Sequence, residues 1–236
     1  MKITILTLFP QMFHGPFEYS IVKRAQEKKQ VLIALVNIRD FGIGKHKTVD
    51  DTPYGGGIGM LLRVDVVSNA ISAVRDKRLA KNKEKVILLG ADGTPFVQNK
   101  AKAYASLEHL ILVCGHYEGI DERIRNYVDE VITIGDFVVT GGEIPAMLIT
   151  DAVIRLVGGV LKTDATRKES FSEKRDENGE RQTLLEYPQY TKPPVYEKRK
   201  VPEILLSGDH KKIELWRQKE AKIRTEQTRS DLLKKQ

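Results

Sequence analysis

Five short apolar runs, rich in β-branched residues, recur along the first part of the chain. Segments with helical spacing or glycine-rich loops separate them. This alternation is typical of an α/β fold built on a largely parallel sheet. The runs that we predict as strands are residues 3–8, 31–36, 86–89, 110–113 and 131–134.

Two helices are predicted from apolar residues that recur every three or four positions. Their stripes are Val67, Ile71 and Val74 in the first helix and Ile144, Leu148 and Ala152 in the second. Asp65 can cap the first helix, Pro145 suits the first turn of the second, and Arg155 lies near the end of the second.

Composition changes abruptly about two thirds of the way along the chain. Residues 162–183 hold few apolar side chains, and we predict a flexible interdomain linker there. The chain then resumes with prolines and a helix that Ser207 or Asp209 can cap. We therefore predict a main domain at residues 1–161 and a small helical domain at residues 184–236.

The chain is basic, with 39 Lys and Arg against 32 Asp and Glu and a formal net charge of +7 over 236 residues. A basic surface favours a polyanionic partner, because each phosphate that it neutralises releases counterions. Cations are dense in residues 211–236. They form either an RNA-facing surface or a solvated helix face.

The only cysteine, Cys114, follows an apolar run and is predicted to be a buried thiol. A single thiol cannot form an internal disulfide, which fits a reducing compartment. The sequence has neither a signal-peptide core nor an apolar stretch near the roughly 20 residues of a membrane span. We therefore expect a cytoplasmic protein with no membrane contact.

Residues 54–60 concentrate glycines that a purely structural loop would rarely retain, because each costs conformational entropy. The segment lacks the Gly-Lys-Ser/Thr ending of a phosphate-binding loop and the frame of a dinucleotide fingerprint. It predicts close approach to a bound base or backbone. The alternative is a mobile tight turn.

Two further loops directly follow predicted strands, at the edge where α/β folds bind their ligands. Residues 114–123 combine glycines with Tyr, Glu and Asp side chains, and residues 135–142 form an apolar loop between glycines. Such an apolar loop, with peptide groups at its edge, can hold an adenine ring. The alternative is a buried crossover. No second His or Cys lies at zinc-ligand spacing, so no metal is expected.

These segments, taken in order, closely resemble the bacterial tRNA (guanine-N1)-methyltransferases of the TrmD type, over nearly the whole chain. The motifs that carry the resemblance are residues 8–13, 48–60, 114–123, 134–147, 159–161, 170–172, 184–193 and 206–210. Several such motifs in one order are very unlikely to arise by chance.

The resemblance implies a SPOUT-type N-terminal domain whose chain forms a deep trefoil knot, which is a rare topology. It implies a bent S-adenosyl-L-methionine held in the knot, and a homodimer with the active site at the subunit interface. It also implies a tRNA substrate in which guanosine 37, next to the anticodon, is methylated at N1.

The family's motifs assign roles to residues of this chain. The resemblance implies Glu169 as general base and Arg155 as the group that stabilises charge on guanine O6. The implied cofactor-binding residues are Leu88, Leu89, Gly115, Tyr117, Glu118, Gly119, Thr133, Ile134, Gly135, Asp136, Phe137, Val138, Val139, Gly141 and Gly142. The implied substrate RNA contacts are Asp50, Gly59, Ser170, Glu186 and Tyr190.

Three departures from the family pattern stand out. Glu169 replaces the usual Asp, residues 90–93 read Gly-Ala-Asp-Gly where the family has Ser/Thr-Pro-Gln-Gly, and residues 173–183 are longer than usual and strongly charged. The first two changes motivate one alternative, a non-catalytic knotted RNA-binding protein. Another alternative is a knotted methyltransferase that acts on a different RNA.

Overall fold

The structure is a computed structural model that describes residues 1–162, 165–166, 169–175 and 181–233. The chain divides into two compact units, Met1–Leu161 and Lys162–Gln236.

The first unit is built on a five-stranded, entirely parallel sheet with the strand order β2-β1-β6-β5-β7. Its strands are β1 (Lys2–Thr7), β2 (Leu32–Asn37), β5 (Glu84–Pro95), β6 (His109–Cys114) and β7 (Glu130–Thr133). Each contains most or all of one predicted run, so the predicted α/β fold with a parallel sheet is confirmed.

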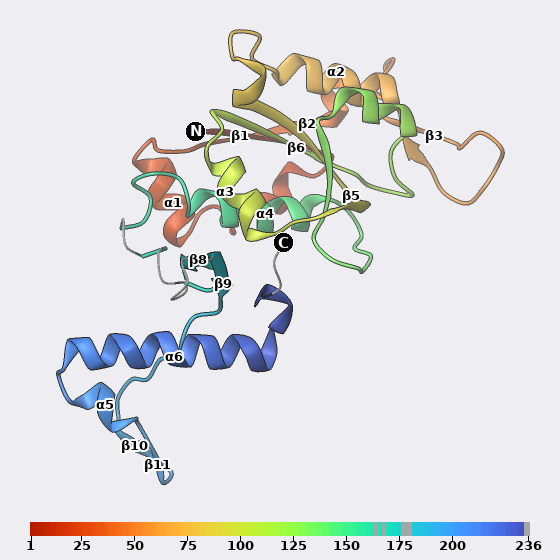
Figure 1. The fold of residues 1–236 in the computed structure, drawn as a ribbon. Coiled ribbons are helices and arrows are strands. Elements are labelled where there is room, and N and C mark those ends of the chain that lie inside the picture. The colour runs from red at the N-terminus through yellow and green to blue at the C-terminus, as the bar shows by residue number, and fades with distance from the viewer. Residues whose placement is uncertain (163–164, 167–168, 176–180, 234–236) are drawn as a thin grey trace. The chain divides into compact units, whose positions relative to one another are not determined.

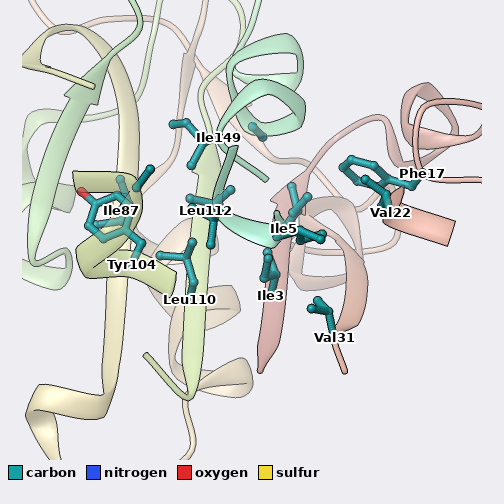
Figure 2. Packing of buried hydrophobic residues seen from close by; sticks show 14 of the residues in the cluster. Ile3, Ile5, Phe17, Val22, Val31, Ile87, Tyr104, Leu110, Leu112 and Ile149 are labelled. Carbon is teal, nitrogen blue, oxygen red and sulfur yellow. The ribbon is translucent and has the colours of Figure 1, made fainter. Parts of the chain in front are cut away.

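Both faces of the sheet are buried, as continuous apolar strands require. All six residues of β6 are buried, and residues 110–114 alternate between two hydrophobic clusters. Leu110 and Leu112 face the first cluster, whose packing Figure 2 shows, while Ile111 and Val113 face the second. This period of two places consecutive residues on opposite faces of the sheet.

Helices cover each face (Figure 1). The first cluster takes residues from three helices: α1 (Ser20–Glu27), α3 (Gln98–Ala105) and α4 (Glu143–Ile154). The second takes residues from α2 (Val64–Val74) and the 3-10 helices η2 (Ile38–Phe41) and η4 (Glu122–Tyr127). The remaining short elements are η1 (Pro10–Phe13), η3 (Lys81–Lys83) and the antiparallel pair β3 (Asp50–Asp51) and β4 (Leu61–Leu62).

Both predicted helices are present, but two details differ from the prediction. Asp65 is not the N-cap of α2, because that position is Arg63, which donates to the Asp65 carboxylate at 2.9 Å. This hydrogen bond lowers the pKa of Asp65. In α4, the residues that defined the predicted helix do not all face the core, because Ile144 and Leu148 are 52% and 47% exposed. The helix instead buries the face that contains Ile149, and its Ile144 side remains an apolar surface.

The second unit contains one long helix, α6 (His210–Thr228), which Asp209 caps by accepting from the N–H groups of Lys211 and Lys212. Its other elements are β8 (Ser172–Arg175), β9 (Arg181–Leu184), β10 (Val195–Tyr196), β11 (Arg199–Lys200), α5 (Glu203–Leu206) and η5 (Ser230–Leu233). Across the described ranges, none of the helices combines the length and apolar content that crossing a bilayer requires.

Within the segment predicted as a linker, residues 162–183, the structure describes one pair of strands. Strands β8 and β9 pair antiparallel, from Ser172 opposite Leu184 to Arg175 opposite Arg181. Strand pairing uses backbone groups, so a shortage of apolar side chains did not prevent it. The rest of the predicted linker includes residues 163–164, 167–168 and 176–180, which lie outside the described residues.

A buried histidine joins β6 to its surroundings at the start of the strand. His109 is 1% exposed, with Nε2 2.8 Å from the Thr4 hydroxyl and Nδ1 2.8 Å from the Glu84 carboxylate. An ionised Glu84 only accepts, so Nδ1 donates and Nε2 accepts from Thr4. Burial lowers the pKa of His109 below its usual 6.5, and the hydrogen bond to Glu84 only partly offsets this effect.

We therefore predict that the protein loses stability as the pH falls, because His109 takes up a proton more readily in the unfolded chain. We expect His109→Gln to reduce this loss. Above pH 6.5 His109 is neutral, and its contribution to the free energy of unfolding is fully present. As the pH falls below 6.5, the unfolded chain binds the His109 proton more readily, so stability is lost at up to about 1.4 kcal/mol per pH unit. Urea unfolding at about pH 7.5 and about pH 5.5 measures this loss. Identical losses in His109→Gln and the wild-type protein would contradict the assignment.

Candidate functional site

A pocket lies beside residues 89–91 of β5 and at the carboxyl ends of β6 and β7, the edge where ligands bind in parallel α/β sheets. Its lining consists mainly of apolar side chains and glycines. The lining residues are Leu89, Gly90, Ala91, Gly115, His116, Tyr117, Glu118, Gly119, Ile132, Thr133, Ile134, Phe137, Val138, Val139, Thr140, Gly141, Gly142 and Pro145. The two loops that follow β6 and β7 supply most of them.

The loop after β6 is held by the glycine-rich segment before β4. The N–H of Glu118 donates to the carbonyl of Met60 at 3.1 Å, and the N–H of Leu62 donates to the carbonyl of Gly119 at 3.0 Å. Tyr117 adopts a φ of +60° and Gly119 a φ of +129°, values that L side chains rarely adopt. The loop therefore turns sharply under the pocket.

The loop after β7 returns to the end of β6. The N–H of Gly142 donates to the carbonyl of Gly115 at 2.8 Å. A Cβ atom on Gly142 would lie 2.6 Å from the Cα of Cys114, so only glycine permits this approach. Thr133 begins the loop, because its hydroxyl donates to the carbonyl of Gly135 at 2.9 Å. The two loops are thus joined by backbone contacts.

The pocket collects most of the predicted cofactor-binding residues. Those in its lining are Leu89, Gly115, Tyr117, Glu118, Gly119, Thr133, Ile134, Phe137, Val138, Val139, Gly141 and Gly142. Leu88 lies in the second hydrophobic cluster, since its side chain faces the opposite side of the sheet from that of Leu89. Gly135 and Asp136 belong to the loop but are not among the lining residues.

Six lining residues are not among the individually predicted cofactor-binding residues: Gly90, Ala91, His116, Ile132, Thr140 and Pro145. Position in the sequence offered a signal for most of them, because they lie within or beside the motifs already singled out. The usable signal for His116 was its place between glycines directly after a buried strand. A polar ring at that position faces the carboxyl edge of the sheet.

The glycine-rich segment also approaches the pocket. Gly59 has a φ of +86°, and a Cβ atom there would lie 2.4 Å from the Cγ of Glu118. Close approach to Glu118 therefore requires glycine at this position. Asp50 lies in β3, which pairs with β4 after this segment. Tyr54 and Ile58, between them, are exposed.

The predicted catalytic residues belong to different units. Arg155 is the C-cap of α4 in the first unit, whereas Glu169 is a half-buried residue of the second. The carbonyl of Glu169 accepts from the Ser172 hydroxyl at 2.6 Å.

Three of the predicted RNA contacts belong to the second unit: Ser170, Glu186 and Tyr190. The Ser170 hydroxyl accepts from the N–H of Glu186 at 3.0 Å, which orders the backbone on both sides. The ring of Tyr190 lies 6.4 Å from that of Trp216 on α6. Aromatic and hydroxyl groups of this kind suit contacts with nucleic acid.

One acidic residue in the loop after β6 is paired with a neighbouring cation. Asp121 accepts from the Arg123 guanidinium at 2.6 and 2.9 Å, which lowers the pKa of this carboxyl. Burial raises the pKa of the Cys114 thiol, so it stays protonated, as predicted for a buried thiol. Over the part of the chain that the structure describes, no group of three or more His, Cys, Asp or Glu is arranged to hold a metal ion.

An apolar, glycine-rich pocket at this edge of a parallel sheet is the place where α/β proteins bind their ligands. The family can be stated from sequence comparison. The sequence model described as tRNA (Guanine-1)-methyltransferase TrmD matches residues 1–235. The chain belongs to this family.

Three relatives illustrate how close the similarity is, and each is named tRNA (guanine-N(1)-)-methyltransferase. The protein of Carboxydothermus hydrogenoformans is 50% identical over 99% of this chain and 88% of its own length. That of Desulforudis audaxviator is 52% identical over 99% and 90%, and that of Dictyoglomus turgidum is 49% identical over 100% and 91%. The resemblance found in the sequence is confirmed.

The contact between the two loops generates a stability prediction. Gly142→Ala forces a Cβ atom against the backbone of Cys114. We expect it to lower the free energy of unfolding by about 1–3 kcal/mol. At Gly158 a Cβ atom meets nothing within 4 Å, so Gly158→Ala should change that free energy by less than about 0.5 kcal/mol. Urea unfolding measures the free energy of unfolding of both variants. Equal changes in the two would show that the fold does not depend on the Gly142 contact.

Proposed function

We propose that this protein methylates N1 of guanosine 37 in tRNA, with S-adenosyl-L-methionine as the methyl donor. The observation that carries the proposal is the family match over residues 1–235. A pocket formed by the same loops that carry the family's motifs supports it. The relatives' names supply the reaction, and the position 37 follows from the family resemblance.

The lining of the pocket suits an adenosyl group. Ile134, Phe137 and Val138 offer apolar surface, and the neighbouring glycines leave peptide groups open to the edge of a base. The space beside Gly115 is open, because a Cβ atom added there would meet only ordinary contacts at 3.6 Å and beyond. A ligand can therefore approach the backbone of Gly115 closely. When bound, the donor supplies a methyl group on a sulfonium that is its own leaving group.

Guanine N1 carries a proton and is not nucleophilic until that proton leaves, so the reaction needs a general base. We assign this role to Glu169, whose carboxylate takes the N1 proton. The negative charge then grows on O6, where the guanidinium of Arg155 stabilises it. Alignment of N1 with the methyl group completes catalysis, with no covalent protein intermediate.

The second unit is proposed to bind the tRNA. Its long helix α6 exposes Lys211, Lys212, Lys219, Lys222 and Arg224, which suit phosphate contacts. Asp50, Gly59, Ser170, Glu186 and Tyr190 are proposed to contact the RNA. The target base must leave its stack to react, so base flipping belongs to the same proposal.

The architecture implied by the family is part of the proposal. It comprises a SPOUT domain at residues 1–161, a linker at residues 162–183 and a tRNA-binding domain at residues 184–236. The tight passage of Gly142 past Cys114 supports a knotted path through the first domain.

We further propose a cytoplasmic homodimer with its active site at the subunit interface. The exposed side chains of Ile144 and Leu148 on α4, next to the pocket residue Pro145, support an apolar interface there. The buried thiol of Cys114 fits a reducing compartment.

The proposal predicts that incubation with S-adenosyl-L-methionine and an unmodified tRNA carrying guanosines 36 and 37 yields 1-methylguanosine. Digestion of the tRNA to nucleosides and mass spectrometry measure the product. A substrate with adenosine at position 37 is the control and should give none. Absence of 1-methylguanosine together with tight tRNA binding would favour a non-catalytic RNA-binding protein, and a 2′-O-methylated product would favour a different knotted methyltransferase.

For the general base, we predict that Glu169→Gln lowers turnover by about 10²- to 10⁴-fold while donor affinity is retained. The amide keeps the shape of the side chain but cannot take the proton. Glu169→Asp is the matched control, because it keeps the carboxylate and should retain most of the activity. Single-turnover methylation and donor titration measure the two effects. Unchanged turnover in Glu169→Gln would assign the base to another residue.

A further inference from the structure

The short hairpin of β10 and β11, in the second unit, has both of its faces in solvent. Residues 195–200 are all exposed, and Val195 and Tyr196 are 50% and 64% exposed. A two-stranded hairpin of this kind buries too little apolar surface to stabilise itself. Packing therefore does not explain which side chains it carries.

The turn of this hairpin holds two residues in a backbone conformation that L side chains rarely adopt. Glu197 has a φ of +47° and Lys198 a φ of +66°. Tyr196 pairs with Arg199 across the turn, so Glu197 and Lys198 are its two central residues. Turns with positive φ at both central positions strongly prefer Asn-Gly. The lysine therefore costs conformational free energy that glycine would not, and such a strained, exposed residue indicates a role for its side chain.

The hairpin also concentrates positive charge. Lys198, Arg199 and Lys200 are consecutive in the sequence. Among the residues that the structure describes, none of these three forms an ion pair with a carboxylate. At the start of α6, by contrast, Lys212 is paired with Asp209 at 3.3 Å. The three cations of the hairpin are therefore available to an anionic partner.

The strand pairing sorts the side chains onto the two faces of the hairpin. Tyr196 lies directly opposite Arg199, and Val195 lies opposite Lys200. Cross-strand partners share a face, whereas successive residues point to opposite faces. One face therefore presents an aromatic ring beside a guanidinium, and Lys198 lies at the tip. In Figure 1 the hairpin extends from the second unit beyond α5 and α6. Proteins hold single-stranded nucleic acid with this combination, since cations bind its phosphates and rings stack on its bases.

We infer that the β10–β11 hairpin is an RNA contact in addition to α6. Lys198, Arg199 and Lys200 bind phosphates of an unpaired stretch of the substrate tRNA. The ring of Tyr196 stacks on a base of the same stretch. Arg199 suits its position, because a guanidinium can donate two hydrogen bonds to one phosphate. This inference rests on the proposed function, which supplies tRNA as the polyanion.

Substitution of Lys198 tests the inference, because it separates the stability of the fold from RNA binding. Lys198→Gly removes the charge and relieves the turn, so the melting temperature should be equal to that of the wild-type protein or higher. Affinity for an unmodified tRNA should nevertheless fall by about tenfold, the size expected for one hydrogen bond between charged groups. The slope of log affinity against log salt concentration should fall by about one. Fluorescence anisotropy with the full chain at several salt concentrations measures both effects.

Lys29 offers a matched control, since it is an exposed lysine with a φ of +55° just after α1 in the first unit. Lys29→Gly makes the same change in charge and in backbone freedom, and it should leave tRNA affinity unchanged. Equal weakening in Lys29→Gly and Lys198→Gly would reduce the effect to net charge and overturn the inference. Unchanged tRNA affinity in Lys198→Gly would overturn it as well.

The ring of Tyr196 is tested separately. Tyr196→Leu keeps an apolar side chain but removes the stacking surface, so tRNA affinity should fall by about five- to a hundredfold with the salt slope unchanged. An unchanged affinity would contradict the stacking contact. A wild-type protein that neither binds nor methylates tRNA would contradict the proposed function, whereas a wild-type protein that does both, with no effect of the hairpin variants, would contradict this inference alone. The two failures are therefore distinguishable.

Discussion

The approach of Gly142 to the end of β6 is the constraint on which the rest of the pocket depends. Its N–H donates to the carbonyl of Gly115, and a Cβ atom would collide with the backbone of Cys114. The contact joins two loops that follow different strands, and it sets where α4 begins. Because α4 starts there, Glu143 enters the core beside Thr7 and faces His116. One glycine thus fixes both the shape of the pocket and the place of the buried Glu143 side chain.

The sheet supplies the rigid base that this contact needs. Strand β6 is buried on both faces and pairs with β1 and β5, so its carboxyl end is held by both hydrophobic clusters. The loops beyond it are constrained by backbone hydrogen bonds more than by side chains. Such a site can hold a ligand by shape and peptide groups, with few charged residues, as the lining shows.

Much of this arrangement could be predicted from the sequence, because it depends on local pattern. Apolar runs gave the five strands, and glycines after two strands gave the pocket loops. The missed features depend on contacts between distant residues: Thr7 and Glu143 are 136 positions apart, and spacing alone does not pair them. The exposure of Ile144 and Leu148 on α4 could not be predicted either, since a helix with apolar residues on several sides does not reveal which face is covered.

The most direct test of the account is a crystal structure of the protein with S-adenosylhomocysteine. The account predicts the adenosyl group between the loops at residues 115–119 and 133–142, with the hydrogen bond from Gly142 to Gly115 unchanged. Ligand bound elsewhere on the first unit, or loops that separate to admit it, would contradict the account.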